Sequence, residues 1–443
     1  MIFDQELTTE QRHSSQRNIN YFNFINGLSY MCAGETIMIL LAVKLGFSDS
    51  VVAVLGGMIF FGFLLLPFGK VVSARVGGAR GQAIFWVARN IAALAMASAT
   101  IWHRLGYRRL ALACMIGGAF LFYGFRAAGI VMAQPLLGDI AIEEERPRFI
   151  AINSSLFHAA CFVSLIVISM VLKFNDSTFA IALIITTGAM LGFTSSSFLR
   201  RVDETRAIRE SAQRPMAREM ITAFRDRSLR RLLMGSFMNN LSTVMLLPVT
   251  VLLVKKGYGM SDTGALLFSL VQFAASAMMS VAVVRVTNRI GPRQTLIGAY
   301  GVMLMTAVLW ALTPNTLAAA IPIVSLLFAL TGSFRITAEN SVTHYFLQTV
   351  PPERRVPASM LMNMTTGVGA GVIGMLLSGW ILHRLGQKVT TSVPGPEMIL
   401  LYRRYFSLAF ALLLPGLIIL LRMEPLPIEK RRLDNAWAKI FRL

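Results

Sequence analysis

The segment "FINGLS" at residues 24–29 returns as "FMNNLS" at residues 237–242, which is 213 positions later in the chain. Three further pairs of segments repeat at offsets of 213, 213 and 209: "GFSDS" (46–50) with "GMSDT" (259–263), "RVGGARGQ" (75–82) with "NRIGPRQT" (288–295), and "GFRAAG" (124–129) with "SFRITA" (333–338). A near-constant offset over such distances indicates an internal duplication. The chain is therefore predicted to consist of two similar halves in parallel orientation.

The composition places both halves in a membrane. Of the 443 residues, 55% are hydrophobic and only 14% are charged, and the mean hydropathy is +0.62. A soluble domain carries about 25% charged residues. A membrane span needs about 20 mostly apolar residues, and uncharged stretches of that size recur along the chain. The sequence thus predicts an all-α polytopic membrane protein, because a transmembrane barrel would show short alternating segments instead.

The uncharged stretches predict twelve spans, six in each half. Their expected ranges are 20–43, 50–69, 84–102, 110–138, 149–172, 177–199, 232–254, 263–286, 294–313, 317–347, 358–382 and 403–421. The expected domains are an N-terminal bundle (1–199), a linker (200–231), a C-terminal bundle (232–425) and a basic tail (426–443). The first 20 residues contain no apolar core of a cleaved signal peptide, so the first span is expected to direct insertion.

The linker is rich in arginine, with ten arginines and no lysine. Met216, Met220, Phe224 and Leu232 form an apolar stripe at roughly helical spacing. This pattern predicts an interfacial helix on the cytoplasmic leaflet. The alternative is a solvated tether between the two bundles.

The positive charges follow the predicted topology. With both termini in the cytoplasm, 28 of the 42 Lys and Arg fall in cytoplasmic segments, as the positive-inside rule requires. Three arginines lie inside spans, namely Arg89, Arg126 and Arg335. This distribution of cations about the membrane accounts for the net charge of +20, so no nucleic acid partner is expected. The expected location is the plasma membrane, the inner membrane of a bacterium.

Two parallel six-span halves, an arginine-rich central linker and a repeated basic turn resemble the major facilitator superfamily of secondary transporters. The turn "NRIGPRQTL" (288–296) is similar to the family's loop motif, with Arg289, Gly291 and Arg293 matching and Asn288 in place of an aspartate. In the first copy Gly78 and Arg80 align with Gly291 and Arg293, and Arg75 occupies the aspartate position. The resemblance implies a cytoplasmic gate at these residues.

The resemblance also implies that spans 1, 4, 7 and 10 line a central cavity, with a site near the bilayer midplane at the interface of the repeats. Arg126 on span 4 and Arg335 on span 10 lie at equivalent positions, about 18–22 Å from the cytoplasmic helix ends. A charge there is costly and is a functional-site hypothesis by default. A guanidinium matches carboxylate or phosphate, so an anionic substrate is predicted. The alternative is structural pairing, above all of Arg335 with Glu339.

Glu35 on span 1 and Glu339 on span 10 are the acids predicted to lie deep within spans. Burial raises the pKa of a carboxyl group and a neighbouring arginine lowers it. A substrate that competes for the arginine would therefore change the acid's proton affinity, which is a route to proton coupling. His158 on span 5 is a further candidate, with a packing role as the alternative.

Neutral polar residues extend the predicted substrate site. They share helix faces with the charged candidates: Asn26 and Tyr30 on span 1, Tyr123 and Gln134 on span 4, and Asn239 and Thr243 on span 7. Such residues bind hydroxylated ligands, and they also form interhelical hydrogen bonds. Gly367, Gly371 and Gly379 are predicted to share one closely packed face of span 11.

These observations favour a proton-coupled symporter of a small organic anion, acting as a monomer. The first alternative is a cation-coupled symporter of neutral sugars, because "MAQPLLGDIAIEEERPRF" (132–149) resembles the region of spans 4 and 5 in glycoside and hexuronide symporters. Drug efflux ranks lower because span 5 lacks the "GxxxGPxxGG" pattern of drug–proton antiporters, and a transport-dead receptor is also less favoured. Cys32, Cys114 and Cys161 form no metal pattern, and no cofactor or enzymatic motif is found.

Overall fold

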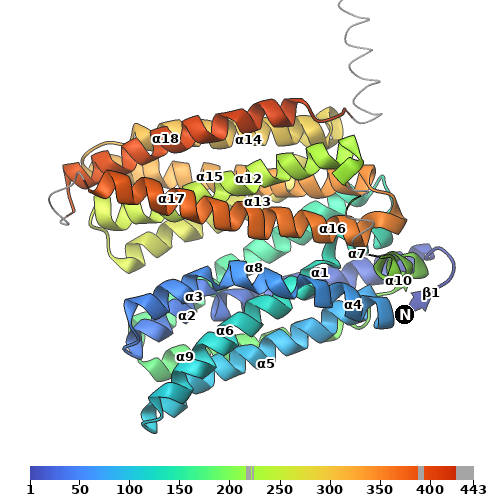
Figure 1. The fold of residues 1–443 in the computed structure, drawn as a ribbon, viewed down its shortest axis with the longest axis horizontal. Helices are drawn as coiled ribbons and strands as arrows, with labels where there is room; N and C mark the ends of the chain where they lie inside the picture. The colour runs from blue at the N-terminus through green and yellow to red at the C-terminus, as the bar shows by residue number, and fades with distance from the viewer. Residues whose placement is uncertain (216–220, 222–223, 388–393, 426–443) are drawn as a thin grey trace, which may run out of the picture. The chain divides into compact units, whose positions relative to one another are not determined.

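The computed structural model describes residues 1–215, 221, 224–387 and 394–425 (Figure 1). Within this part of the chain, twelve helical segments are long and apolar enough to cross a membrane. The predicted all-α membrane fold with twelve spans is thereby confirmed. Most spans extend beyond their predicted ends, and the first runs from Thr9 to Lys44. The extra turns carry polar residues, so hydropathy alone does not reveal them.

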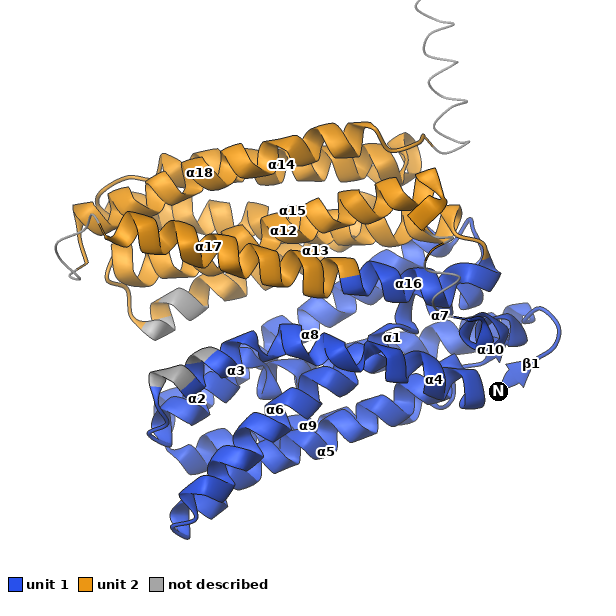
Figure 2. Cartoon of the chain, viewed as in Figure 1, with its two compact units in different colours: residues 1–220, 352–364 blue, residues 221–351, 365–443 orange. Residues whose placement is uncertain are grey.

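The chain divides into two compact units (Figure 2). Unit 1 contains residues 1–220 and 352–364, and unit 2 contains residues 221–351 and 365–443. The sequence-based domain boundaries assign residues 352–364 to the second bundle, whereas these residues pack with unit 1.

Unit 1 holds the first six spans and a short parallel strand pair. Its elements are β1 (Ile2–Phe3), α1 (Thr9–Ala33), α2 (Glu35–Lys44), α3 (Asp49–Gly62), the 3₁₀ turn η1 (Phe63–Leu65), α4 (Leu66–Val76), α5 (Gly78–Arg104), α6 (Arg108–Ile130), α7 (Ala133–Ile140), α8 (Arg146–Phe174), α9 (Thr178–Leu199), β2 (Glu204–Thr205), α10 (Arg206–Gln213), η3 (Pro352–Arg354) and α16 (Arg355–Asn363).

Unit 2 holds the remaining spans. Its elements are α12 (Arg227–Leu252), the π-helical turn η2 (Leu253–Gly257), α13 (Asp262–Ile290), α14 (Pro292–Ala311), α15 (Leu317–Thr349), the π-helical segment η4 (Met364–Ala370), α17 (Gly371–Gly386) and α18 (Pro396–Leu421).

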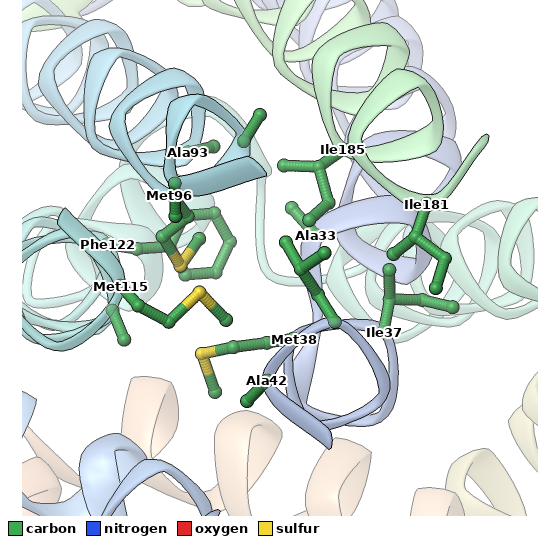
Figure 3. Close-up of a cluster of buried hydrophobic side chains, with 14 of the residues drawn as sticks. Ala33, Ile37, Met38, Ala42, Ala93, Met96, Met115, Phe122, Ile181 and Ile185 are labelled. Carbon is green, nitrogen blue, oxygen red and sulfur yellow. The ribbon is translucent and has the colours of Figure 1, made fainter. Parts of the chain in front are cut away.

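The core of unit 1 is filled by methionine, isoleucine and alanine side chains (Figure 3). Met38 on α2, Met96 on α5 and Met115 on α6 meet at its centre and are fully buried. Alanines such as Ala93 keep the facing helices close, which is how helices associate without a hydrophobic driving force in lipid.

Glycines bring the second and fourth spans of unit 1 into backbone contact. A Cβ atom on Gly62 would lie 2.6 Å from the carbonyl carbon of Tyr123, and one on Gly69 would collide with the carbonyl oxygen of Ala128. Gly124 on α6 likewise packs against Leu65. We call these three glycines and their contacts the glycine seam.

The core of unit 2 is aromatic. Trp310 on α14 stacks on Phe406 of α18 with ring centroids 5.7 Å apart, and meets Phe328 of α15 edge-on at 5.6 Å. Such offset and edge-to-face pairs each add about 0.5–1.5 kcal/mol beyond burial. Tyr405 hydroxyl donates to the carbonyl oxygen of Met245, at 2.8 Å, and ties α18 to α12.

Several spans are interrupted. Gly34 adopts an extended conformation between α1 and α2, and the fourth span breaks between α6 and α7. Span 11 contains the π-helical segment η4, which turns the helix out of α-helical register. The predicted glycine face of span 11 is therefore wrong: Gly371 is buried, whereas Gly379 has no neighbouring atom within reach of a Cβ.

The linker contains a helix that the sequence did not predict. Helix α10 buries Ile208, Ser211 and Ala212 against unit 1. The predicted interfacial helix rests on Met216 and Met220, which lie outside the described residues. The basic tail, residues 426–443, also lies outside them.

Candidate functional site

The break at Gly34 positions two of the predicted site residues, Tyr30 and Glu35. A Cβ on Gly34 would lie 2.9 Å from the carbonyl oxygen of Tyr30, so glycine permits the sharp change of direction. Glu35 is the first residue of α2, where the helix dipole favours a carboxylate. Its Oε1 lies 3.8 Å from the place that a Cβ would take on Gly56 of α3. The carboxylate is exposed and faces the second span.

Arg126 on α6 lies over the aromatic ring of Tyr30. The guanidinium carbon is 5.1 Å from the ring centroid, which is a cation–π distance. Phe157 of α8 packs on the same ring with centroids 6.1 Å apart. Within the described part of the chain, Arg126 forms no ion pair. The ring therefore supports the cation without neutralising it.

Tyr123 completes this group, one helical turn before Arg126. Its side chain is 1% exposed, and its hydroxyl has no hydrogen-bond partner among the described residues. The phenol interacts electrostatically with Tyr30, Glu35 and Arg126. We call Tyr30, Glu35, Tyr123 and Arg126 the Tyr30 cluster. It combines one cation, one carboxylate and two phenols from α1, α2 and α6.

The other predicted site residues of unit 1 lie outside this cluster. Asn26 is buried and accepts hydrogen bonds from Trp86 Nε1 at 2.9 Å and Arg89 Nη1 at 3.0 Å. Gln134 lies on α7, beyond the helix break, and its Oε1 is buried without a partner among the described residues. His158 on α8 has its Nδ1 2.8 Å from the carbonyl oxygen of Ser154, which fits the packing alternative. Its proton-coupling role stays a prediction.

Arg89 is a central residue to which the sequence assigned no role. It is 0% exposed, and its guanidinium donates to Asn26, Ser29 and Asn90. The rings of Trp86 and Phe122 lie 5.1 and 5.3 Å from its Cζ. Its place inside an apolar span was the only signal of its role. The bonds fix α5 to α1, so we assign Arg89 to the scaffold.

In unit 2, Arg335 and Glu339 form the ion pair that the sequence offered as an alternative to substrate contact. The guanidinium Nη1 and the carboxylate Oε1 are 3.4 Å apart on α15. The side chains are 22% and 42% exposed, so the pair is not fully enclosed within unit 2. Arg335 thus carries its own counterion, in contrast to Arg126.

The neutral polar residues of unit 2 bond to their own helices. Thr243 hydroxyl donates to the carbonyl oxygen of Asn239 at 3.2 Å, one turn earlier on α12. Asn239 is 2% exposed, and its Oδ1 has no partner among the described residues. These contacts neither require nor exclude a ligand, so the substrate role of both residues stays a prediction.

The two basic turns have the same backbone conformation, but the residues that correspond in the structure differ by one position from the sequence alignment. Gly77 has φ +93° and Gly291 has φ +89°, and each ends one helix and begins the next. Gly77 therefore corresponds to Gly291, and the predicted equivalence with Gly78 is wrong. Arg80 then no longer corresponds to Arg293. The sequence could not decide this because only the backbone shows which of two adjacent glycines adopts positive φ.

The remaining gate residues differ in their contacts. Arg293 donates from Nε to the carbonyl oxygen of Met423 at 2.8 Å and from Nη2 to that of Leu421 at 2.6 Å, so it caps the end of α18. Four predicted gate residues are exposed: Arg75, Arg80, Asn288 and Arg289. Their gating role stays a prediction.

The acid that the first basic turn lacks is supplied by the linker. Glu204 Oε2 accepts hydrogen bonds from the backbone N–H groups of Gly78 at 2.8 Å and Ala79 at 3.1 Å, in the first turn of α5. Burial raises the pKa of this carboxyl group to about 7, against the lowering effect of the two N–H donors. Sequence analysis missed this contact because it joins residues 126 positions apart.

Within the described part of the chain, no three His, Cys, Asp or Glu side chains are placed so that they could hold a metal ion.

Comparison with protein families gives a match to the Major Facilitator Superfamily model over residues 21–372. Two relatives carry the name "Putative multidrug resistance protein MdtD". The protein from Enterobacter sp. (strain 638) is 29% identical over 203 residues, and that from Escherichia coli (strain SMS-3-5 / SECEC) is 26% identical over 196. The matches cover 45% and 44% of this chain and 41% of each relative, so the chain matches less than half of their length.

Solved structures share the fold at low sequence identity. A bacterial homologue of the iron transporter ferroportin, in an outward-facing state, aligns with a TM-score of 0.68 and 12% identity, covering 92% of this chain and 98% of that one. The human organic anion transporter MFSD10 (TETRAN) aligns at 0.67 and 10%, covering 92% and 99%. The proton:xylose symporter XylE aligns at 0.64 and 13%, covering 92% and 96%. At these identities the likeness concerns the fold alone.

Proposed function

We propose that this chain, which belongs to the major facilitator superfamily of transporters, moves a small organic anion across the membrane together with protons. The transport cycle would be alternating access by two bundles around a central site. The acting species would be a monomer in a bacterial inner membrane with both termini cytoplasmic.

The observation that carries this proposal is the state of Arg126. A charge at the bilayer centre costs about 2.5–3.5 kcal/mol on insertion scales, and this arginine has no carboxylate partner in the described residues. The ring of Tyr30 offsets only part of that cost, because cation–π contacts contribute about 0.5–2 kcal/mol. An anionic substrate would supply the missing counterion. Its carboxylate would accept bidentate hydrogen bonds from the guanidinium.

Glu35 supports the coupling to protons. It begins α2, its carboxylate is accessible, and it acts on the same Tyr123 phenol as Arg126. A bound anion beside the Tyr30 cluster would disfavour the ionised form of the Glu35 carboxylate by like-charge repulsion. Glu35 would then take up a proton more readily, so anion and proton would bind together.

A second candidate function is export of drug-like compounds, which the two MdtD relatives favour. Neutral-sugar symport is the further alternative, and Arg126 argues against it because a neutral sugar leaves the cation unpaired. The same proposal includes roles in binding or coupling for Asn239, Thr243, Gln134 and Glu339. The same assay tests them.

The test is uptake into proteoliposomes under an imposed inward proton gradient, with sugar acids, dicarboxylates, neutral sugars and a lipophilic cation as solutes. Arg126→Ala should reduce uptake of the transported anion about 10- to 150-fold, since a hydrogen bond to a charged group contributes about 1.5–3 kcal/mol. Arg126→Lys should recover only part of the loss, because lysine lacks the planar fork. Arg109→Ala, an exposed arginine on the same helix, is the matched control.

Each other outcome decides against the anion proposal or against Arg126 as the residue that binds the anion. Transport of a neutral sugar that survives Arg126→Ala would establish the sugar alternative. Proton-driven movement of the lipophilic cation in the opposite direction would establish export. Anion uptake that is unaffected by Arg126→Ala, in protein with unchanged thermal stability, would make Arg126 structural.

A further inference from the structure

The outer face of α1 forms an open groove with α8. The groove has a volume of about 560 Å³, and its lining includes His13, Arg17, Asn20, Tyr21 and Phe24 of α1 and Leu156 of α8. Phe22 lies on the opposite side of α1, where its ring meets Trp86 of α5 inside unit 1. The groove therefore faces away from the core of unit 1.

The lining of the groove changes from polar to apolar along α1. His13 and Arg17 come first, and Tyr21 and Phe24 follow. Arg17 and Phe24 are seven residues apart, which is about 10 Å along a helix. The headgroup layer of a bilayer is about 5–8 Å thick on each side, so a groove of this length reaches from the headgroups into the hydrocarbon. Tyr21 is 51% exposed, and tyrosine is enriched at the level of the headgroups.

An amide cluster holds the two walls of the groove together. Asn153 of α8 donates from Nδ2 to Asn20 Oδ1 at 3.4 Å, and its own Oδ1 accepts a hydrogen bond from Asn23 Nδ2. Further along α1, a Cβ on Gly27 would lie 2.6 Å from the carbonyl oxygen of Phe157, so glycine lets α8 approach closely. The walls are thus held by contacts within unit 1, independently of any ligand.

Two arginines stand at the polar end of the groove. Within the part of the chain that the structure describes, neither Arg17 nor Arg201 forms an ion pair. Arg201, just after α9, has its Cζ 5.8 Å from the ring centroid of Phe198, and that ring lies 5.4 Å from the ring of Tyr21. Asn18 Nδ2 donates to the carbonyl oxygen of Arg201 at 3.2 Å, which holds the end of α9 beside α1.

The surrounding charge favours an anion at this end. Glu10 is the one acid of α1 and lies in its first turn, about 10 Å along the helix before Arg17. Both guanidinium groups are exposed, and a guanidinium presents a planar fork that matches phosphate oxygens. The polar end is therefore suited to a phosphate, and the rest of the lining to an apolar chain.

We propose that this groove binds an anionic membrane phospholipid. Its phosphate is held by Arg17 and Arg201, and its acyl chain lies along Phe24 and Leu156. Free phosphate would use only the two cations, whereas the aromatic and aliphatic lining suits a ligand with an apolar part. A lipid supplies both parts at the depth where the groove changes from polar to apolar.

The duplicated half retains the cation without the aromatic ring. Arg230 of α12 corresponds to Arg17 at the offset of 213 residues, and it is exposed. Met234 stands where the first copy has Tyr21. Arg230 therefore supplies a matched control, because its loss removes the same charge from the corresponding place in unit 2.

The test is photocrosslinking of the full chain in vesicles of equimolar phosphatidylglycerol and phosphatidylcholine with identical acyl chains. Phe24 is replaced by p-benzoylphenylalanine, which keeps the aromatic ring and reacts with neighbouring C–H bonds under ultraviolet light. Mass spectrometry of the purified protein gives the ratio of the two lipid adducts. Neighbours taken at random give a ratio near one. Each cation near an anionic lipid favours it about fivefold, so the two arginines predict a ratio of about 25.

Variants of the arginines separate the site from general attraction to charge. Arg17→Ala should lower the ratio about fivefold, and Arg17→Lys should lower it less because the charge remains. Arg230→Ala should leave the ratio unchanged. Thermal unfolding in detergent shows that each variant keeps its fold. If Arg17→Ala does not, Arg201→Ala decides in its place, with the same expected fivefold loss.

Three results would overturn the proposal. A ratio near one in the chain with both arginines would mean that the groove meets lipids without selecting them. Equal losses in Arg17→Ala and Arg230→Ala would mean a general effect of charge. A ratio that falls to one in excess inorganic phosphate would mean a site for a soluble anion. Because no transported solute is present, the result is independent of the proposed anion transport.

Discussion

Arg126 and Arg335 occupy corresponding places in the two units, yet their surroundings differ. Arg126 lies over Tyr30 and has no carboxylate partner in the described residues, whereas Arg335 pairs with Glu339 at 3.4 Å. The duplicated sequence thus supplies the same cation twice and its counterion once. We infer that the unit without the counterion is the one adapted to bind an anion.

The helices that carry these sites differ in the same way. The first span is broken at Gly34, whereas α12 continues through Pro248, which lies 213 positions after Glu35. Residue type alone suggests the opposite, because proline breaks helices more strongly than glycine. In a membrane, neighbouring helices can form hydrogen bonds with the backbone groups that a proline leaves without a partner. The break at Gly34 gives Glu35 a place at a helix start, which the repeat in unit 2 does not provide.

The largest expected effect on stability comes from Arg89 and tests the difference between the cores of the two units. Arg89→Met should lower the free energy of unfolding by about 2–4 kcal/mol, because the acceptors on Asn26, Ser29 and Asn90 lose a charged donor. Thermal unfolding in detergent measures this, with Arg104→Met, an exposed residue of the same helix, as the control. A stabilised Arg89→Met would mean that unit 1 is held by packing alone, like the aromatic core of unit 2.

A smaller effect is expected at the helix break. Gly34→Ala places a Cβ 2.9 Å from the carbonyl oxygen of Tyr30 and should cost about 1–2 kcal/mol through overpacking. Pro248→Ala should not lower stability, since α12 is already continuous there. Both variants are measured by the same thermal unfolding. Equal losses in the two variants would remove the distinction between the broken and the continuous span.

The smallest effect concerns the pair in unit 2. A double-mutant cycle with Arg335→Ala and Glu339→Ala should give a coupling energy below about 0.5 kcal/mol, because an i,i+4 ion pair along one helix contributes about 0.2–0.5 kcal/mol. Thermal stability of the four proteins supplies the cycle. A coupling of several kcal/mol would show that the pair is a buried structural element, and would sharpen the contrast with Arg126.

The fold was predictable because hydropathy and the repeat report directly on twelve apolar spans. Arg126 and Arg335 were found for a similar reason: a charge inside an apolar run is costly wherever its partner lies. The Arg335–Glu339 pair was available from the sequence as an alternative because the two residues lie one turn apart on one helix, whereas the contact of Arg126 with Tyr30 was not predictable because Tyr30 comes from another helix. The break at Gly34 was missed because glycines are common within membrane helices.

The linker shows where sequence patterns stop being informative. Helix α10 has eight residues, too few for a clear period, and it is held by Ile208 and Ser211 rather than by its own propensity. Glu204 accepts hydrogen bonds from backbone N–H groups on another span. Nearly every residue type has such a group, so the sequence does not show which ones Glu204 binds. The apolar stripe of Met216 and Met220, which did suggest a helix, falls outside the described residues.

The glycine seam makes part of unit 1 mechanically stiff. Where side chains separate two helices, a displacement of one is absorbed by rotamer changes, but Gly62 and Gly69 bring the second span against the backbone of α6. A displacement of the end of α4, where α10 is attached, is therefore expected to move α6 through this close contact. Arg126 lies on that helix. The seam thus gives the linker a mechanical path to the helix that carries the cation.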